Sequence, residues 1–555
     1  MMAHMLSFES ISMRFNQFHF PRIALSMPTF IVIMAGYFAT VLNYPVIYQL
    51  FQLSKATAHS WFPYTSPLLL FFGFLIIFSV FAIPYLFKPI MAFITLTSAA
   101  ALYAAVSFHV LFDRSMMESV FETNLSEASF YFNVTSVLYV VVFGVIPSLF
   151  IFSVRVVPQS SWLKVVVARS GLVLIGCVGI VIIAAISYKD YASIGRNNKY
   201  LSKMIIPAHI YSAVSYLDKT YFTPVLVYKP QGEDAKLTPT SNGKPTLVVV
   251  VLGETARGMN FAYNGYKRET NPYTQHLGMI SLQHVTSCGT YTALSVPCMF
   301  SSFERQNYNK ARAMAQDNVL NIISHAGVDV LWVDNDGGDK GVAKKLPYQA
   351  IDSSLKGDEC DGKTCFDAVM LSDADAFFRQ GQSNKLLVLH TIGSHGPTYW
   401  QRYPQHIGSF SPACNRSDIE NCTDEQITNV YDNTLVYTDY ILSQVIEKLK
   451  KYSNSYNVAM MYISDHGESL GEKGLYLHGT PYAIAPAEQT HVPWLIWMPK
   501  QYAEQKGIDV TCIAKEAQAN AYSHDNFFHS LLSFYGVQTH VIDPALDMIA
   551  PCQHG

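Results

Sequence analysis

Polar side chains that could bind a metal ion or a phosphate group follow apolar runs in the C-terminal part of the chain. Glu254 comes just after the run 247–252 (LVVVVL), and Asp465 and His466 come just after the run 458–463 (VAMMYI). A single carboxylate after a strand is usually a helix N-cap, but several such ends together favour a shared site. Two carboxylates and an imidazole are typical zinc ligands when one position stays open. We therefore predict a zinc site here.

Neighbouring loops carry further residues of the same kind. His395 lies in Ser-His-Gly-Pro, and His478 lies in Leu-His-Gly-Thr-Pro. Either could be an ordinary surface or core histidine, but both loops suit contact with a substrate or a second metal ion. Asp465 and His466 can reach one ion only from a sharp loop, and we expect Gly467 to permit that turn.

The segment 287–298 (SCGTYTALSVPC) contains a candidate nucleophile. Cys288 and Cys298 could pin a tight loop that holds Thr290 and Thr292. A threonine hydroxyl is a weak nucleophile until a metal ion or a base lowers its pKa. Without the zinc ligands, a pinned structural loop would be the simpler interpretation.

These residues need a scaffold that brings distant loops together. Four apolar runs indicate strands buried on both faces, and the patterns of 317–326 and 431–450 indicate helices between them. This rhythm predicts an α/β fold with a mainly parallel sheet, in which ligands gather at the carboxyl ends of the strands. The four runs are 247–252, 328–333, 386–389 and 458–463.

The first third of the chain has the composition of a membrane domain. Between Met27 and Val110 the only Lys, Arg, Asp or Glu residues are Lys55 and Lys88. Hydrophobic residues make up 50% of the chain, and the net charge of -3 gives no reason to expect nucleic-acid binding. We predict a transmembrane domain over 1–188, a membrane-surface linker over 189–240 and a catalytic domain over 241–555. Five stretches are long enough to span a bilayer, at about 28–48, 66–87, 89–111, 131–153 and 166–187.

Charged loops and cysteines predict the same orientation independently. The turns on one side are basic, whereas the loop 112–130 on the other side is acidic, so the positive-inside rule places the N-terminus in the cytoplasm. Five spans then deliver the C-terminal domain to the opposite side. That domain holds eight cysteines, which predict disulfides and an oxidising compartment. Proximity favours the pairs Cys288–Cys298, Cys360–Cys365 and Cys414–Cys422, which leaves Cys512 and Cys552 as the fourth pair; structural metal thiolates are the alternative.

Several strings together resemble the lipid A phosphoethanolamine transferases, a family that includes the mobile colistin-resistance enzymes. The five-span layout is similar too, so the resemblance covers nearly the whole chain. The strings are residues 253–257 (GETAR), 264–266 (NGY), 288–293 (CGTYTA), 394–397 (SHGP) and 464–472 (SDHGESLGE).

The resemblance implies an alkaline-phosphatase/sulfatase-like domain in the periplasm, anchored in the inner membrane of a Gram-negative cell. It implies that Glu254, Asp465 and His466 hold Zn²⁺, with Thr292, the second threonine of the string, as nucleophile and fourth ligand. It also implies that His395 and His478 bind the phosphoryl group or further zinc and supply acid–base catalysis. Lys340 matches a basic substrate contact and Glu127 an acidic one.

The implied reaction transfers phosphoethanolamine from phosphatidylethanolamine to a lipid A phosphate through a phosphothreonine intermediate, with consequences for colistin resistance. We expect a monomer that contacts membrane lipid and no nucleic acid. A phosphoglycerol transferase, or an enzyme acting on another periplasmic glycan, is the nearest alternative. A membrane receptor or transporter with a periplasmic binding domain is a more distant alternative. A transporter should carry ionisable residues within its spans, and the predicted spans carry almost none. The sulfatase reaction is excluded, since Cys298 lacks the following Pro and Arg that formylglycine formation needs.

Overall fold

The computed structural model describes residues 23–54, 62–123, 128–129, 131–222, 224 and 226–553. The chain divides into two compact units. One comprises Met1–Val106 and Val134–Tyr211, and the other comprises Ser107–Asn133 and Ser212–Gly555. Glu127, the predicted acidic substrate contact, lies outside the described residues. So do Arg14 and Arg22, which precede the first predicted span and contribute to its basic side.

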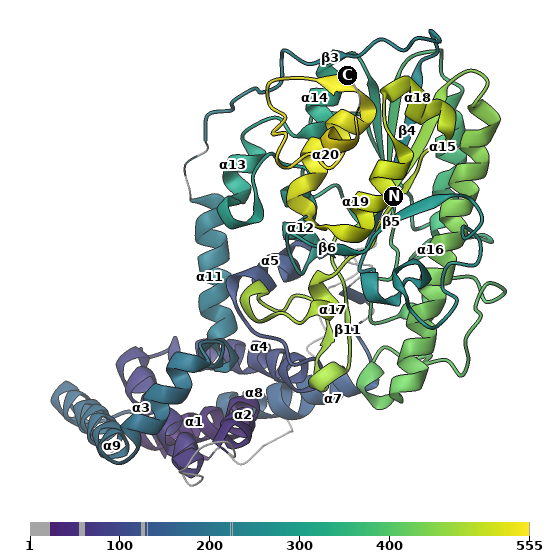
Figure 1. Cartoon of the computed structure of the whole chain (residues 1–555). Helices are drawn as coiled ribbons and strands as arrows, with labels where there is room; N and C mark the ends of the chain where they lie inside the picture. Colours follow the sequence, from purple (N-terminus) through teal and green to yellow (C-terminus); the bar gives the residue numbers. More distant parts are fainter. Residues whose placement is uncertain are drawn as a thin grey trace, which may run out of the picture. The chain divides into compact units, whose positions relative to one another are not determined.

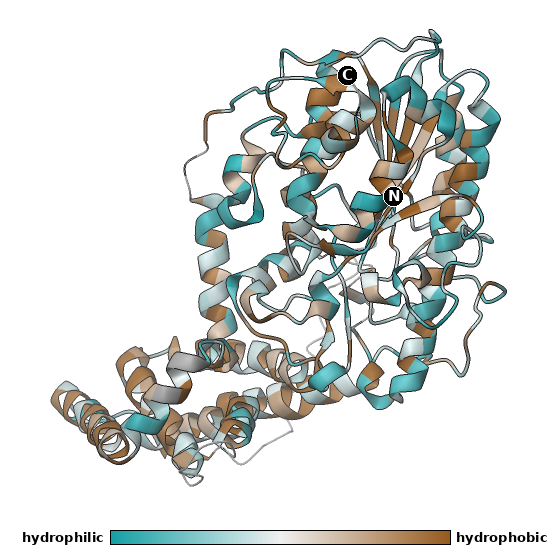
Figure 2. Ribbon diagram, viewed as in Figure 1, coloured by the Kyte–Doolittle hydropathy of each residue, from teal (hydrophilic) through white to brown (hydrophobic). Residues whose placement is uncertain are grey.

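The first unit is built from apolar helices, which appear brown in Figure 2. Within the described residues, four helices are long and apolar enough to cross a membrane, and a bent pair at the start makes five. They correspond to the five predicted stretches. The bent pair is Met27–Leu42 with Tyr44–Ser54, and the others are Phe62–Phe81, Phe87–Ser107, Val134–Ser153 and Trp162–Ala192.

The first span bends by 55° between its two helices. Asn43 lies at the break and is fully buried. Its side-chain amide donates to the carbonyl oxygens of Phe38 and Ile206, at 2.8 Å each, and accepts from the Ile206 N–H at 2.9 Å. A break in a helix leaves backbone groups without their helical partners. This asparagine satisfies one of them, the Phe38 carbonyl, and joins the break to Ile206.

The remaining elements of the first unit are short or extend past the predicted boundaries. Helix α9 continues to Asn197, well into the predicted linker. Two short strands pair in parallel, Ala24–Ser26 (β1) with Arg155–Val157 (β2). The helices are α1 (Met27–Tyr37), α2 (Tyr44–Ser54), α3 (Ser66–Phe81), α4 (Phe87–Ser107), α7 (Val134–Val140), α8 (Ile146–Ser153), α9 (Trp162–Asn197) and α10 (Leu201–Met204). Helix α11 (Ala208–Tyr221) begins in the first unit and continues into the second.

The second unit is organised by a seven-stranded sheet with the order β5-β13-β10-β4-β9-β7-β8 (Figure 1). All four predicted strands are present, and the pairs joining β10, β4, β9, β7 and β8 are parallel. β13 runs antiparallel to both of its neighbours, so the sheet is mixed but mostly parallel. The strands are β5 (Met279–Leu282), β13 (Trp494–Trp497), β10 (Asn457–Ser464), β4 (Thr246–Gly253), β9 (Lys385–His390), β7 (Asp329–Asp334) and β8 (Tyr348–Ala350).

Helices cover both faces of this sheet (Figure 1). Val248, Val250 and Leu252 point to one face and share a core cluster with Leu320 of α14 and Phe528 of α20. The long helix α16 lies on the other side and begins with a capping box at Thr423, which explains its start. The predicted helices 317–326 and 431–450 correspond to α14 and α16. The main helices are α12 (Thr292–Met299), α14 (Val319–His325), α15 (Met370–Phe378), α16 (Asp424–Tyr452), α18 (Lys500–Lys506), α19 (Val510–Ala519) and α20 (Phe527–Tyr535).

All four predicted disulfides are confirmed. They join Cys288 to Cys298, Cys360 to Cys365, Cys414 to Cys422 and Cys512 to Cys552. The ninth cysteine, Cys177, is unpaired and exposed on α9.

Candidate active site

Two neighbouring parallel strands place the predicted metal ligands together. Gly253 at the end of β4 is paired in register with Ser464 at the end of β10, so Glu254 and Asp465 emerge side by side. Glu254, Asp465 and His466 are all fully buried. One ligand atom from each lies within 4.8 Å of the other two, which is close enough for a single ion.

Thr292 is the first residue of α12, and its hydroxyl lies beside two of these residues, Glu254 and His466. The Thr292 Oγ lies 3.3 and 3.2 Å from the two carboxylate oxygens of Glu254 and 3.4 Å from His466 Nε2. Thr290, the other candidate in this segment, donates instead to the carbonyl oxygen of Thr480 at 2.7 Å. The geometry therefore separates two threonines that the residues alone left equivalent.

The arrangement of acceptor atoms fits a bound cation. His466 Nδ1 lies 2.9 Å from the Gly467 carbonyl oxygen, which can only accept, so Nδ1 carries the hydrogen. Burial lowers the pKa of His466 to about 4, so its Nε2 presents a lone pair. That lone pair lies 3.2 Å from Asp465 Oδ2 and 3.5 Å from Glu254 Oε1, which are also acceptors. A divalent cation between the three atoms would turn this repulsion into coordination.

The hydrogen bonding and the pKa shifts of the two carboxylates are also those expected of metal ligands. Asp465 Oδ1 accepts from the N–H groups of Thr255 and His466, but Oδ2 has no hydrogen-bond partner in the part of the chain that the structure describes. Burial raises the pKa of Asp465, and burial together with the Asp465 charge raises the pKa of Glu254. Two buried carboxylates are costly unless a cation compensates them.

Gly467 is required for a different reason from the one predicted. Its φ angle is not positive, so the turn does not depend on a left-handed glycine. Instead, a Cβ at this position would lie 2.1 Å from the Glu488 carbonyl oxygen. The predicted turn argument is therefore wrong, and close backbone packing explains the glycine.

His478 and His395 lie beside this cluster. The ring centroid of His478 is 4.5 Å from that of His466 and 5.5 Å from that of His395. His478 Nδ1 lies 2.9 Å from buried Glu468, whose other oxygen accepts from the Tyr399 hydroxyl at 3.0 Å. Burial alone would lower the pKa of His478, but the Glu468 carboxylate raises it to about 9.

His395 has the opposite electrostatic character. Burial lowers its pKa well below the usual value, and the positive charges of His478, Arg402 and Lys340 lower it further. Its Nδ1 is buried without a hydrogen-bond partner among the described residues. Lys340, at a positive φ of 49°, is thus near enough to act on His395 electrostatically. The two histidines offer one protonated and one neutral imidazole.

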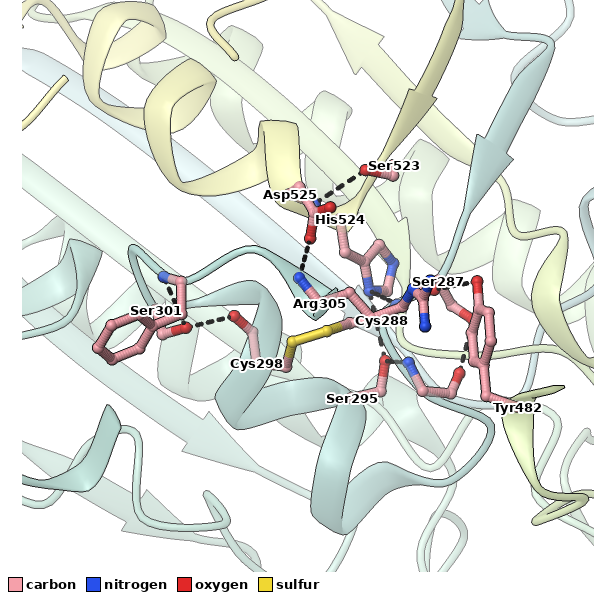
Figure 3. Close-up of a disulfide and its surroundings, with 12 residues drawn as sticks. Ser287, Cys288, Ser295, Cys298, Ser301, Arg305, Tyr482, Ser523, His524 and Asp525 are labelled. Carbon is pink, nitrogen blue, oxygen red and sulfur yellow. Dashed lines mark hydrogen bonds between the residues drawn. A yellow bond between two sulfur atoms is a disulfide. The ribbon is translucent and has the colours of Figure 1, made fainter. Parts of the chain in front are cut away.

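His524 links the candidate nucleophile segment 287–298 to the loop 464–467 that carries two of the predicted metal ligands. Figure 3 shows its ring beside Cys288 and Ser295 of the first segment. Its Nδ1 accepts from the Cys288 N–H at 3.1 Å, and its Nε2 donates to the Ser464 carbonyl oxygen at 3.0 Å. Ser295 of α12 adds a parallel link, because its hydroxyl donates to the Asp465 carbonyl oxygen at 2.5 Å. The nucleophile helix is therefore tied to the metal loop at two points, and the Cys288–Cys298 disulfide closes the segment between them.

A second set of contacts reaches the nucleophile segment from the loop before Asn133. Helix α5 (Arg114–Glu122) supplies Glu118, which accepts from the Tyr291 hydroxyl at 3.3 Å. Lys310 lies 2.7 Å from Glu118 and 2.9 Å from Glu122. Tyr291 directly precedes Thr292, so this loop belongs to the surroundings of the site.

Sequence reasoning missed several of these residues. Glu468 stands inside a string used for the resemblance, and its spacing from His466 was the available signal. His524, Glu118 and Lys310 belong to no motif, and nothing in the sequence marks them. Polar residues also follow the predicted strands 328–333 and 386–389, and these the sequence did mark. Among them, Asp334 and His390 form a buried pair at 2.9 Å, and possible ligand atoms of Glu254, Asp336 and His390 lie within 4.8 Å of one another.

The fold and site define an alkaline-phosphatase-like or sulfatase-like enzyme domain. The chain matches the sulfatase family over residues 246–537, and it matches the family described as phosphoethanolamine transferase EptA/EptB over residues 70–221.

Full-length relatives specify the family further. The chain is 37% identical to phosphoethanolamine transferase EptA of Escherichia coli (strain K12), over 96% of this chain and 98% of that one. It is 34% identical to phosphatidylethanolamine transferase Mcr-1 of Escherichia coli, over 82% and 84% of the two chains. The structure of the integral membrane protein lipooligosaccharide phosphoethanolamine transferase A from Neisseria meningitidis superposes with a TM-score of 0.92, at 35% identity over 96% of this chain and 100% of that one. The chain belongs to the phosphoethanolamine transferase family of enzymes.

Proposed function

We propose that this enzyme transfers phosphoethanolamine from phosphatidylethanolamine to a phosphate of lipid A, with Thr292 as covalent nucleophile and Zn²⁺ held by Glu254, Asp465 and His466. The observation that carries the proposal is the Thr292 hydroxyl, which lies 3.2 Å from Glu254 and 3.4 Å from His466 Nε2. Two relatives, a phosphatidylethanolamine transferase and a lipooligosaccharide phosphoethanolamine transferase, support this donor and this class of acceptor.

In the first half-reaction, the Thr292 oxygen attacks the phosphorus of the donor, and the bond from phosphorus to the diacylglycerol oxygen breaks. Glu254 accepts the hydrogen bond of the Thr292 hydroxyl and is placed to receive its proton. Zinc, when bound, would lower the pKa of this hydroxyl and stabilise the phosphoryl charge. His478 holds a proton because Glu468 raises its pKa to about 9, and this proton is available to the leaving oxygen.

In the second half-reaction, a lipid A phosphate oxygen attacks the same phosphorus, the bond to Thr292 breaks and the hydroxyl is restored. His395 is neutral because burial lowers its pKa, so it suits the role of the base that takes a proton from the attacking lipid A phosphate. Lys340 contributes positive charge on the same side and suits contact with a substrate phosphate. We extend to Glu127 the role of an acidic partner for the ethanolamine ammonium.

The location follows from the same proposal. Both substrates are lipids, so apolar helices that hold the enzyme in the bilayer confine it and its substrates to one surface. Four disulfides in the second unit, together with basic turns on the opposite side of the predicted spans, support a periplasmic site and an inner-membrane anchor. We propose a monomer, since one chain supplies every residue of the site. The product places an amine on an anionic phosphate, which would weaken colistin binding to lipid A.

The test is turnover of fluorescent phosphatidylethanolamine by the purified full-length protein, with and without lipid A. We expect diacylglycerol release, and in the presence of lipid A a product heavier by one phosphoethanolamine. Thr292→Ala should abolish both, whereas Thr290→Ala is the matched control in the same loop and should retain the chemistry. Equal release by wild type and Thr292→Ala, or transfer of phosphoglycerol from phosphatidylglycerol in its place, would overturn the proposal.

A further inference from the structure

A cavity of about 690 Å³ lies within the first unit, far along the chain from the catalytic residues. Its walls come from the start of α1, the turn between α3 and α4, the end of α8 with β2, and the first turns of α9. Phe152, Tyr85 and Phe87 are among the apolar side chains that line it. A cavity of this size accommodates a lipid headgroup and the first carbons of its chains.

The polar lining of this cavity is cationic. Lys88, Arg155 and Arg169 all line it, and none of the described residues that line it is acidic. The Lys88 ammonium is held at the wall by the carbonyl oxygens of Phe152, at 3.3 Å, and Val154. Three positive charges around one cavity create an attractive potential for an anion.

Arg169 is the most informative of the three residues. It is the eighth residue of α9, so it lies roughly 10 Å into a helix of membrane-spanning length. Its Nε is buried, and no hydrogen-bond partner for it occurs among the described residues. An arginine near a helix end can extend its head to the interface, but this one lines a cavity together with two other cations. An ionisable residue in such a place is a candidate binding group.

We infer that this cavity binds the headgroup of a phospholipid with a net negative charge, of the phosphatidylglycerol class, through Lys88, Arg155 and Arg169. The phosphodiester of such a lipid carries a negative charge that can pair with the three cations. Its acyl chains match the apolar helices around the cavity. Phosphatidylethanolamine fits less well, because its ammonium would enter a cationic cavity whose described lining residues include no carboxylate. The site therefore binds a structural or regulatory lipid and not a second molecule of the proposed donor.

The test is lipid binding by the purified full-length protein, delipidated in detergent and titrated with phosphatidylglycerol or phosphatidylethanolamine of the same acyl chains. Native mass spectrometry counts the bound molecules. We expect one phosphatidylglycerol to bind much more tightly than phosphatidylethanolamine. Each lost cation should weaken it about fivefold, so Arg169→Gln gives one such step and Arg155→Gln with Arg169→Gln gives two. Lys164→Gln removes an equal charge from the same helix without touching the cavity and should change nothing.

Equal binding of the two lipids by the wild type would overturn the inference, because it would show only nonspecific lipid association. So would an equal effect of Lys164→Gln, which would indicate general surface attraction. Arg169→Lys keeps the charge and should keep the preference for phosphatidylglycerol. This variant, together with size-exclusion chromatography of each protein, distinguishes lost binding from lost folding.

Discussion

The link made by His524 predicts a large effect from a residue that touches neither the substrate nor the proposed metal ion. His524→Leu removes both ring hydrogen bonds, to the Cys288 N–H and to the Ser464 carbonyl oxygen. Each leaves a buried backbone group without its partner, at a cost of about 1–3 kcal/mol. The two together should destabilise the second unit by roughly 2–6 kcal/mol, unless the nucleophile segment moves away from β10 to reach water.

That movement is the reason to expect a catalytic effect. Cys288 lies four residues before Thr292, and Ser464 directly precedes Asp465, so the two bonds set the spacing of nucleophile and metal loop. A displacement of about 1 Å between reacting groups costs on the order of 100-fold in rate. His524→Gln is the rescue variant, because one side-chain amide can accept from the N–H and donate to the carbonyl.

The matched control is His529→Leu. His529 is also buried, and its Nδ1 accepts from the Asp543 N–H at 3.0 Å, but it has no bond to the metal loop. The assays are thermal unfolding and the single-turnover rate of phosphatidylethanolamine cleavage. We expect both leucine variants to unfold at lower temperature and only His524→Leu to lose most of its rate. If the two variants lost equal stability and equal activity, the positioning role of His524 would be refuted.

Three further predictions test separate parts of the structure. Lys310→Met removes the ammonium that holds both glutamates of α5, and it should cost roughly 1–3 kcal/mol and raise amide exchange in α5; unchanged exchange would contradict this. Because burial lowers the pKa of Lys506 from 10.5 to about 8, the folded state binds fewer protons than the unfolded state between these values, and stability should rise with pH over that window. Lys506→Met should therefore stabilise the protein at pH 7, by roughly 3 kcal/mol, with the gain fading above pH 8; a gain independent of pH would refute the assignment. Gly467→Ala forces a Cβ against the Glu488 carbonyl oxygen and should lower bound zinc measured by elemental analysis, whereas Gly357→Ala, which meets nothing within 4 Å, should not.

The sheet and its site edge could be predicted because their pattern is local. Runs such as 247–252 are short and apolar throughout, as strands buried on both faces require, and β4 is fully buried along its length. Once the strands are parallel neighbours, the residues after them must meet, so Glu254 and Asp465 were found from sequence. Three of the disulfides followed from short separations along the chain, and Cys512–Cys552, which are 40 residues apart, followed as the two cysteines left.

The parts that could not be predicted depend on contacts between distant segments. β5 and β13 are short and pair antiparallel at one edge, and nothing in their residues indicates that direction. His524 is separated from Cys288 by 236 positions, and Lys310 from Glu118 by 192. The steric role of Gly467 depends on where Glu488 lies, which periodicity does not reveal. Tertiary packing, rather than local propensity, determines each of these features.

The most direct measurement of the central claim is the covalent state of Thr292 during turnover. Full-length protein loaded with zinc is incubated with phosphatidylethanolamine without an acceptor, quenched with acid and digested for peptide mass spectrometry. We expect one phosphoethanolamine group on Thr292, its loss when lipid A is added, and no such group on any residue in Thr292→Ala. Diacylglycerol release with Thr292 unmodified, or a phosphoethanolamine group on a different residue that turns over at the catalytic rate, would contradict this expectation.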